Sequence, residues 1–210
     1  MFDSPLQAVV LRRSGITALV QLDKKRIGVG PKANALEAYT RPILKILGIS
    51  AEIHNGAHAA MAAELLSGDL DAYVTLQGTP VPAIEEAAAK EPLAFVSPSP
   101  EQMEAIRKVM PEFSPSKIPA GTYRFLQTDY ATVGMFNFAI GRADLPDDLV
   151  YQLVKAVIEN QPRLLKAHSA ASETVPQNVN KNTFLPFHPG AVRYYREIGI
   201  SIPDSLVLTN

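Results

Sequence analysis

Residues 26–47 read Arg-Ile-Gly-Val-Gly-Pro-Lys-Ala-Asn-Ala-Leu-Glu-Ala-Tyr-Thr-Arg-Pro-Ile-Leu-Lys-Ile-Leu, and this stretch decides the fold class. Its first five residues form a short apolar strand pattern that ends in glycine. From residue 35 onward the apolar side chains recur at helical spacing, in a segment that Asn34 can cap and Gly48 can end. A strand, a glycine loop and a helix in this order begin an α/β unit.

The same alternation extends on both sides of this stretch. Further strands are expected at residues 6–11, 51–54, 72–76 and 93–96, and further helices at 58–66, 83–90 and 100–109. Strands that alternate with helices at this spacing predict an α/β fold with a mainly parallel sheet flanked by helices.

The alternation stops at residues 110–128, which are rich in Pro and Gly and are predicted to be irregular. An apolar strand is expected over 131–141, followed by an amphipathic helix that begins at Asp144 or Asp147. Residues 168–186 are predicted to be a loop, and a short helix over 189–197 follows it.

Composition excludes several classes of protein. The chain has 210 residues, of which 47% are hydrophobic and 20% charged, enough for one large domain or two small lobes with a real core. A net charge of −1 with scattered basic residues argues against a nucleic-acid partner. The absence of cysteine excludes disulfides, thiolate nucleophiles and Cys-based zinc sites. No apolar stretch approaches the about 20 residues of a membrane span, and no signal peptide is recognised after Met1.

The loop between the first strand and helix of the opening stretch is one candidate ligand site. Gly30, Lys32 and Asn34 would bring donors to a carboxylate or phosphate at the start of a helix. The spacing also fits the Gly-x-Gly-x-x-Ala pattern of dinucleotide-binding proteins, but Pro31 removes a donor and no acidic residue closes a second strand at the usual distance. An ordinary strand–helix turn is the alternative interpretation.

A second candidate group follows the strand at 72–76. Gln77 and Thr79 lie where open α/β sheets place their ligands, and both can hydrogen-bond a polar head group. Tyr123 offers an apolar ring with a polar tip, which suits the lining of a cleft. A simple turn explains the first two residues equally well, and packing explains Tyr123.

No combination of residues predicts catalysis, a cofactor or a metal site. His54 and His58 are four residues apart, but an Asn-Gly pair between them interrupts any common helix. His188 precedes Pro-Gly and is expected to cap the last helix, while Asp69 and Asp71 are expected in a solvated turn. No Gly-x-Ser-x-Gly nucleophile motif is present. We therefore expect a protein that is not an enzyme.

Six stretches in chain order carry a resemblance to a known family: Ser14-Gly15-Ile16, Lys24-Lys25-Arg26-Ile27-Gly28-Val29-Gly30, Gly68-Asp69-Leu70-Asp71-Ala72, Ile118-Pro119-Ala120-Gly121-Thr122-Tyr123, and residues 144–151 and 187–195. Together they resemble the TAXI-type solute receptors of tripartite ATP-independent periplasmic (TRAP) transporters. The resemblance implies the type II periplasmic-binding fold, a periplasmic location, capture of a small carboxylate or acidic amino acid, and partnership with the membrane permease subunits.

The resemblance also implies a domain organisation. Residues 26–122 would form the second, continuous lobe, and residues 1–25 and 123–210 would be the remnant of the first lobe with the hinge crossings. The family's leader and the Gly-rich, Tyr-containing loop of its first lobe have no counterpart here. Where the family has Ser-Gly-Thr, this chain has Asn34-Ala35-Leu36, which removes two hydroxyl donors. The alternative is a truncated paralogue that acts as a non-binding structural module, with a homodimer as its possible form.

Overall fold

The computed structural model describes residues 2–32, 35–182 and 184–208. The chain divides into two compact units. One comprises Asp3–Met135, and the other comprises Phe136–Asn210 together with Met1–Phe2. Each is described by itself.

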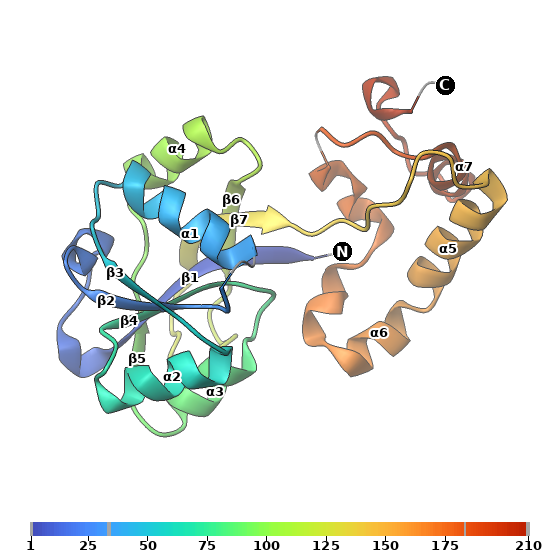
Figure 1. Cartoon of the computed structure of the whole chain (residues 1–210). Coiled ribbons are helices and arrows are strands. Elements are labelled where there is room, and N and C mark those ends of the chain that lie inside the picture. Colours follow the sequence, from blue (N-terminus) through green and yellow to red (C-terminus); the bar gives the residue numbers. More distant parts are fainter. Residues whose placement is uncertain (1, 33–34, 183, 209–210) are drawn as a thin grey trace. The chain divides into compact units, whose positions relative to one another are not determined.

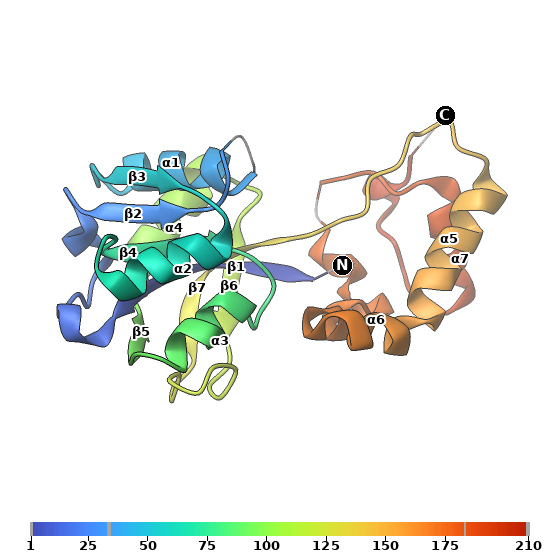
Figure 2. The same cartoon turned by 60° about the horizontal axis from the view of Figure 1, so that its bottom comes forward.

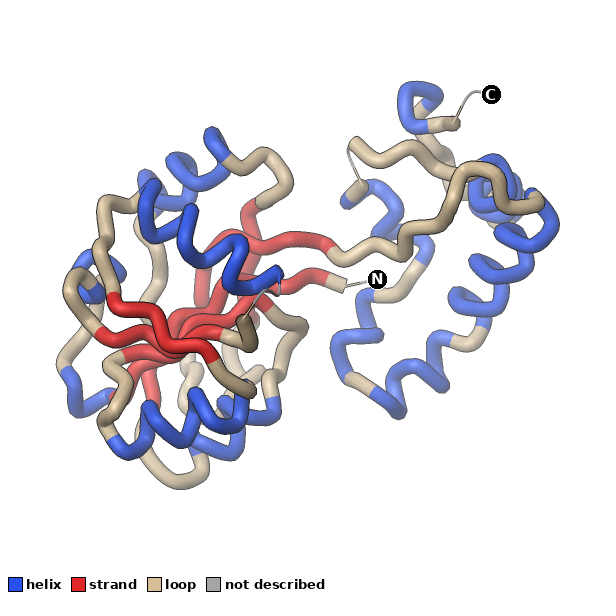
Figure 3. Tube along the Cα trace, in the orientation of Figure 1, coloured by secondary structure: helices blue, strands red, loops and turns tan. Residues whose placement is uncertain are grey.

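The first unit is built on a mixed sheet in the order β3-β2-β4-β1-β7-β6, with β5 also paired to β1 (Figure 3). The strands are β1 (Asp3–Leu11), β2 (Arg26–Val29), β3 (Glu52–Asn55), β4 (Ala72–Leu76), β5 (Leu93–Phe95), β6 (Ser114–Ile118) and β7 (Tyr130–Phe136). β2 runs parallel to β3 and β4, whereas β1 is antiparallel to β4 and β5, and β6 is antiparallel to β7. The expected parallel pairing therefore holds for the three strands of the repeated strand–helix units, and β1 enters the sheet in the opposite direction.

Helices cover both faces of this sheet (Figure 1). They are α1 (Ala35–Ile46) and α4 (Pro100–Val109) on one face, and α2 (His58–Ser67) and α3 (Pro82–Ala88) on the other. The fully buried Val29 and Ile106 belong to the core under the first pair, and the buried Leu65 and Ile84 belong to the core under the second. Alternate residues of each strand thus bury their side chains in two separate cores.

The compact unit extends beyond the predicted boundaries of 26–122 on both sides. β1 pairs with β4 and β5, which places residues before 26 in the middle of the sheet. β7 pairs with β6, which adds residues after 122. The boundaries of the compact body are therefore 3–135, because strand pairing joins segments far apart in the chain. How these parts correspond to the two lobes of a receptor stays a prediction.

Residues 110–128 were predicted to be irregular, but Ser114–Ile118 form β6. This strand lies at the end of the sheet order and has mostly exposed, polar residues. Its sequence lacks the alternation of a half-buried strand, and only its pairing with β7 defines it. The apolar strand expected over 131–141 ends earlier, at Phe136.

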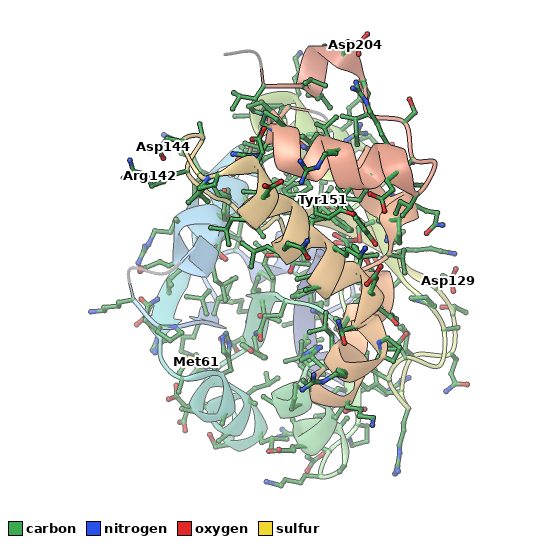
Figure 4. The ribbon with its side chains drawn as sticks, turned by 90° about the vertical axis from the view of Figure 1, so that its right-hand side faces the viewer. Met61, Asp129, Arg142, Asp144, Tyr151 and Asp204 are labelled. Atoms are coloured by element: carbon green, nitrogen blue, oxygen red, sulfur yellow. The ribbon has the colours of Figure 1, made fainter. Side chains whose placement is uncertain are left out.

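The second unit is helical and contains α5 (Asp147–Glu159), α6 (Gln161–Ala167) and α7 (Pro189–Glu197). α5 packs on α7, and Tyr151 of α5 donates a 2.6 Å hydrogen bond to Glu197 (Figure 4). At Gly190 the helices approach so closely that a Cβ atom would overlap the Asp147 carbonyl oxygen. α6 was not expected from the sequence. None of the helices that the structure describes is long and apolar enough to cross a membrane.

The start of α7 confirms one expectation. The His188 Nδ1 atom accepts a 3.2 Å hydrogen bond from the Gly190 backbone N–H, so the side chain caps the helix. Further along the helix, Tyr194 and Tyr195 are each 2% exposed and pack in the interior of the unit.

Candidate ligand-binding site

The carboxyl ends of β2, β3 and β4 lie at one edge of the sheet, because these three strands are parallel and adjacent (Figure 2). Gly30 follows β2, Asn55 ends β3, and Gln77 follows β4. The Asn55 side-chain amide donates a 3.1 Å hydrogen bond to the Gly30 carbonyl oxygen, which ties two of the strand ends together. Open α/β sheets bind their ligands at such an edge.

Polar side chains from β4, the turn after it and the start of α2 meet beside these strand ends. The Tyr73 hydroxyl of β4 lies 2.8 Å from Nδ1 of His58, the first residue of α2. The Gln77 amide nitrogen lies 3.2 Å from the same ring nitrogen and 2.6 Å from the Thr75 hydroxyl. Burial lowers the pKa of His58 and raises the pKa of Tyr73 to about 12, so both side chains are uncharged at neutral pH.

A buried hydrogen-bond network holds the backbone of Gln77 and Val81 next to these polar side chains. The Gln7 side chain of β1 donates a 3.0 Å hydrogen bond to the Gln77 carbonyl oxygen. The Tyr123 hydroxyl donates to Gln7 Oε1 at 2.7 Å and accepts from the Val81 backbone N–H at 2.8 Å. Because each of these buried groups has a partner, the network holds the strand ends rigidly.

The structure brings only some of the predicted site residues together. Gly30 and Gln77 lie on adjoining strand ends at the same edge, with Thr79 half-buried two residues further on. Lys32 is exposed in the loop after Gly30. Asn34, predicted to cap the helix and bind the ligand, lies outside the described residues.

Tyr123 occupies a core position, not the predicted cleft position. Its side chain is 1% exposed, and its hydroxyl is engaged by Gln7 and Val81. The ring contacts Phe95 edge-on at a centroid distance of 5.3 Å. A phenol that is enclosed and bonded on both sides positions the chain around it and has no free group to offer a solute.

Gly28 also has a structural role. A Cβ atom there would overlap the side chain of Leu70 and crowd that of Met61, which projects from α2 (Figure 4). The residue is glycine because Leu70 and Met61 pack closely on β2.

Sequence reasoning missed Asn55 as a site residue and treated His58 only as part of a metal pair. The structure separates the two histidines, since His54 Nε2 lies 3.2 Å from Glu52 whereas His58 faces Tyr73. Across the described residues, no group of three or more His, Asp or Glu side chains could hold a metal ion. Asn55 and His58 could have been predicted as site residues, because they lie at and just after the end of a parallel strand. The same criterion led to the prediction of Gln77.

Three hollows in the described part of the first unit have volumes of about 410, 350 and 310 Å³. They lie beside α1 and β3, beside α3, and beside β5, and none is lined by the strand-end residues.

The chain belongs to the NMT1-like family, whose family model matches residues 1–199. The family match does not name the TAXI receptors, so that finer assignment stays a prediction.

Solved structures that resemble parts of the chain include the following three. One is an ABC transporter periplasmic binding protein from Brucella ovis with glutathione bound, at 15% identity and a TM-score of 0.38 over 45% of this chain and 30% of that one. A probable amino-acid ABC transporter extracellular-binding protein from Bacillus subtilis matches at 15% identity and 0.36, over 65% and 47%. An amino acid ABC transporter substrate-binding protein from Streptococcus pneumoniae, bound to L-arginine, matches at 15% and 0.38, over 64% and 44%. The chain therefore spans less than half the length of each, and these partial likenesses carry no argument about ligands.

Proposed function

We propose that this chain is a non-enzymatic solute-binding protein that captures a small carboxylate or amino acid and delivers it to a membrane transporter. One observation carries the proposal: uncharged hydrogen-bonding groups from Asn55, His58 and Gln77 lie at the carboxyl ends of three parallel strands, with Thr79 two residues beyond Gln77. The buried network beneath them fixes their positions before a solute arrives, which reduces the ordering cost of binding.

The chemistry of this edge suits binding. Amides, a hydroxyl and a neutral imidazole form hydrogen bonds in both directions, and such groups can orient a polar solute. The exposed Lys32 in the adjoining loop adds a cation that favours a carboxylate. Capture and release need only a change in the arrangement of the parts that contact the solute.

The solute and transporter classes follow from the resemblance to TAXI receptors, which associates the chain with carboxylates, acidic amino acids and an ATP-independent permease. Receptors of amino-acid ABC transporters are the nearest alternative class. Both work on the outer side of the cytoplasmic membrane, and we propose a periplasmic location for this protein.

The binding proposal is tested by thermal unfolding of the purified chain with L-glutamate, 2-oxoglutarate, L-arginine and glutathione. A solute that binds only the native state stabilises it by about 2.7 kcal/mol at a concentration of 100 Kd. We expect at least one of the four to raise Tm. If the folded chain shows no shift with any of them at millimolar concentration, the proposal is wrong.

The transporter class is tested separately by uptake into membrane vesicles that contain a candidate permease together with this protein. Uptake that continues without ATP supports the TRAP assignment. A strict requirement for ATP contradicts it and supports an ABC transporter.

A structural or dimerising role is the second candidate, and the surface of α5 favours it. Leu149, Leu153 and Val157 are spaced four residues apart, so they form one stripe, and they are 46%, 53% and 43% exposed. An apolar stripe of this kind marks a contact surface. A concentration-dependent dimer that Leu153→Glu abolishes, in a chain that binds no solute, would favour this role over the first.

A further inference from the structure

We infer that His58 recognises the solute by donating a hydrogen bond from Nε2 to a carboxylate or carbonyl oxygen, and that Tyr73 is the positioning residue that gives His58 this role. The inference rests on the proposed function. It goes further by naming the contact and the chemical group of the solute that makes it.

The contacts of Nδ1 determine which ring nitrogen carries the proton. The Tyr73 hydroxyl lies 2.8 Å from His58 Nδ1, and the Gln77 amide nitrogen lies 3.2 Å from the same atom. The Gln77 amide nitrogen can only donate, and it lies closer to Nδ1 than to Nε2, whereas the Tyr73 hydroxyl can donate or accept. With Nδ1 as the acceptor of both hydrogen bonds, the proton is on Nε2.

The surroundings keep this arrangement in place at neutral pH. Tyr73 is 1% exposed, and its hydroxyl stays protonated because burial raises its pKa to about 12. Burial also lowers the pKa of His58, so the ring stays neutral. The hydroxyl comes from the middle of the sheet and the ring from the start of α2, so the geometry is set by the packing of α2 on β4.

The Nε2–H group has no acceptor in the part of the chain that the structure describes. The one polar atom recorded near it is the Gln77 amide nitrogen at 3.4 Å, and an amide nitrogen does not accept a proton. His58 is only half-buried, so this donor can reach a group from outside. A solute oxygen can accept a hydrogen bond from the Nε2–H group. A solute ammonium group has only donors, so it would place a second donor against the Nε2–H donor.

The first measurement concerns the free protein and needs no solute. Long-range ¹⁵N–¹H spectra of the imidazole rings at about pH 7.5 report the tautomer, and the loss of one signal set in His58→Gln assigns it. We expect the Nε2–H form in the wild-type chain and a mixture of tautomers in Tyr73→Phe. A wild-type ring protonated on Nδ1 would overturn the inference.

The second measurement is affinity by calorimetry for whichever carboxylate of the four-solute panel binds. A hydrogen bond to a charged group is worth about 1.5–3 kcal/mol, so His58→Leu should weaken binding about 10- to 100-fold. His58→Gln keeps an N–H donor at nearly the same reach and should restore affinity to within a few fold of wild type. Tyr39→Phe, which removes a hydroxyl from α1, is the matched control for Tyr73→Phe and should bind normally.

The outcomes separate the two proposals. If the wild-type chain binds none of the four solutes, the proposed function fails and the inference fails with it. If the wild-type chain binds and His58→Leu, folded by circular dichroism, binds equally well, only the inference is overturned.

Discussion

Removal of the Tyr123 hydroxyl is the sharpest test of the buried network beneath the candidate site. The Tyr123→Phe substitution takes away one oxygen atom and leaves the ring against Phe95. That oxygen accepts from the Val81 N–H at 2.8 Å and donates to Gln7 Oε1 at 2.7 Å. Both partners lose a hydrogen bond in a region that water does not reach, since Tyr123 is 1% and Gln7 0% exposed.

The expected loss of stability follows from the two groups left without a hydrogen-bond partner, Gln7 Oε1 and the Val81 N–H. A buried polar group left without a partner costs about 1–3 kcal/mol. Two such groups, with some relaxation around them, should lower the free energy of unfolding by about 2–4 kcal/mol. Against a typical total of about 5–15 kcal/mol, this is a large fraction of the stability.

The assay is urea unfolding followed by far-UV circular dichroism, because the chain has no tryptophan to report by fluorescence. Tyr39→Phe is the matched control. Tyr39 packs edge-on against Phe113, and its hydroxyl makes no hydrogen bond to the residues that the structure describes. The control should change the free energy of unfolding by no more than about 0.5 kcal/mol.

Equal, small effects of the two substitutions would refute the reasoning. In that case the Tyr123 hydroxyl would not hold Gln7 and Val81, and its predicted place in a ligand cleft would become tenable again. A large loss of stability with unchanged solute affinity in the folded variant would instead confirm that Tyr123 acts through the core.

Three further substitutions test other parts of the structure. Gly28→Ala would push a methyl group into the side chains of Leu70 and Met61, which pack on β2, and should cost about 1–3 kcal/mol in the same urea assay; a neutral effect would contradict that close packing. Gly190→Ala would drive a Cβ atom into the Asp147 carbonyl oxygen and should loosen α5 from α7, seen as faster amide hydrogen exchange in both helices, whereas unchanged exchange would contradict the contact. The pKa of Asp71 is raised by burial but lies below its ordinary value overall, because Arg26 donates hydrogen bonds to the carboxylate. A carboxyl group with a lowered folded-state pKa adds stability above its unfolded pKa of about 3.9 and loses it as the pH falls through the folded value. Asp71→Asn should therefore flatten the fall of Tm between about pH 7 and about pH 3, and an unchanged slope would argue against the Arg26 pair.

Local patterns predicted most of the secondary structure. The strand at 72–76 and the helices at 100–109 and 189–197 were placed at the residues where the structure has them. Each follows from information within a few residues: apolar side chains at a fixed period, a capping residue, and Pro in the first turn. Where that information was absent, as in the polar edge strand β6, the prediction was wrong.

Only part of the candidate site could be predicted from the sequence. The position after a parallel strand selected Gly30 and Gln77, and the structure places both at the carboxyl edge of the sheet. The same position selects Asn55, which the sequence reasoning overlooked. Nothing near Tyr123 in the chain could show that its hydroxyl meets Gln7, 116 residues earlier.

The sequence by itself determined that this chain alternates strands and helices and has an apolar core, because both depend on neighbouring residues and on the exclusion of apolar groups from water. The tertiary structure decided the direction of β1, the buried role of Tyr123 and the contact between His58 and Tyr73. These depend on which distant segments meet, since a hydrogen bond at 2.8 Å exists only when the packing of α2 and β4 brings His58 and Tyr73 together. The order of strands across the sheet, which no local pattern records, is therefore what turns separate polar residues into one candidate site.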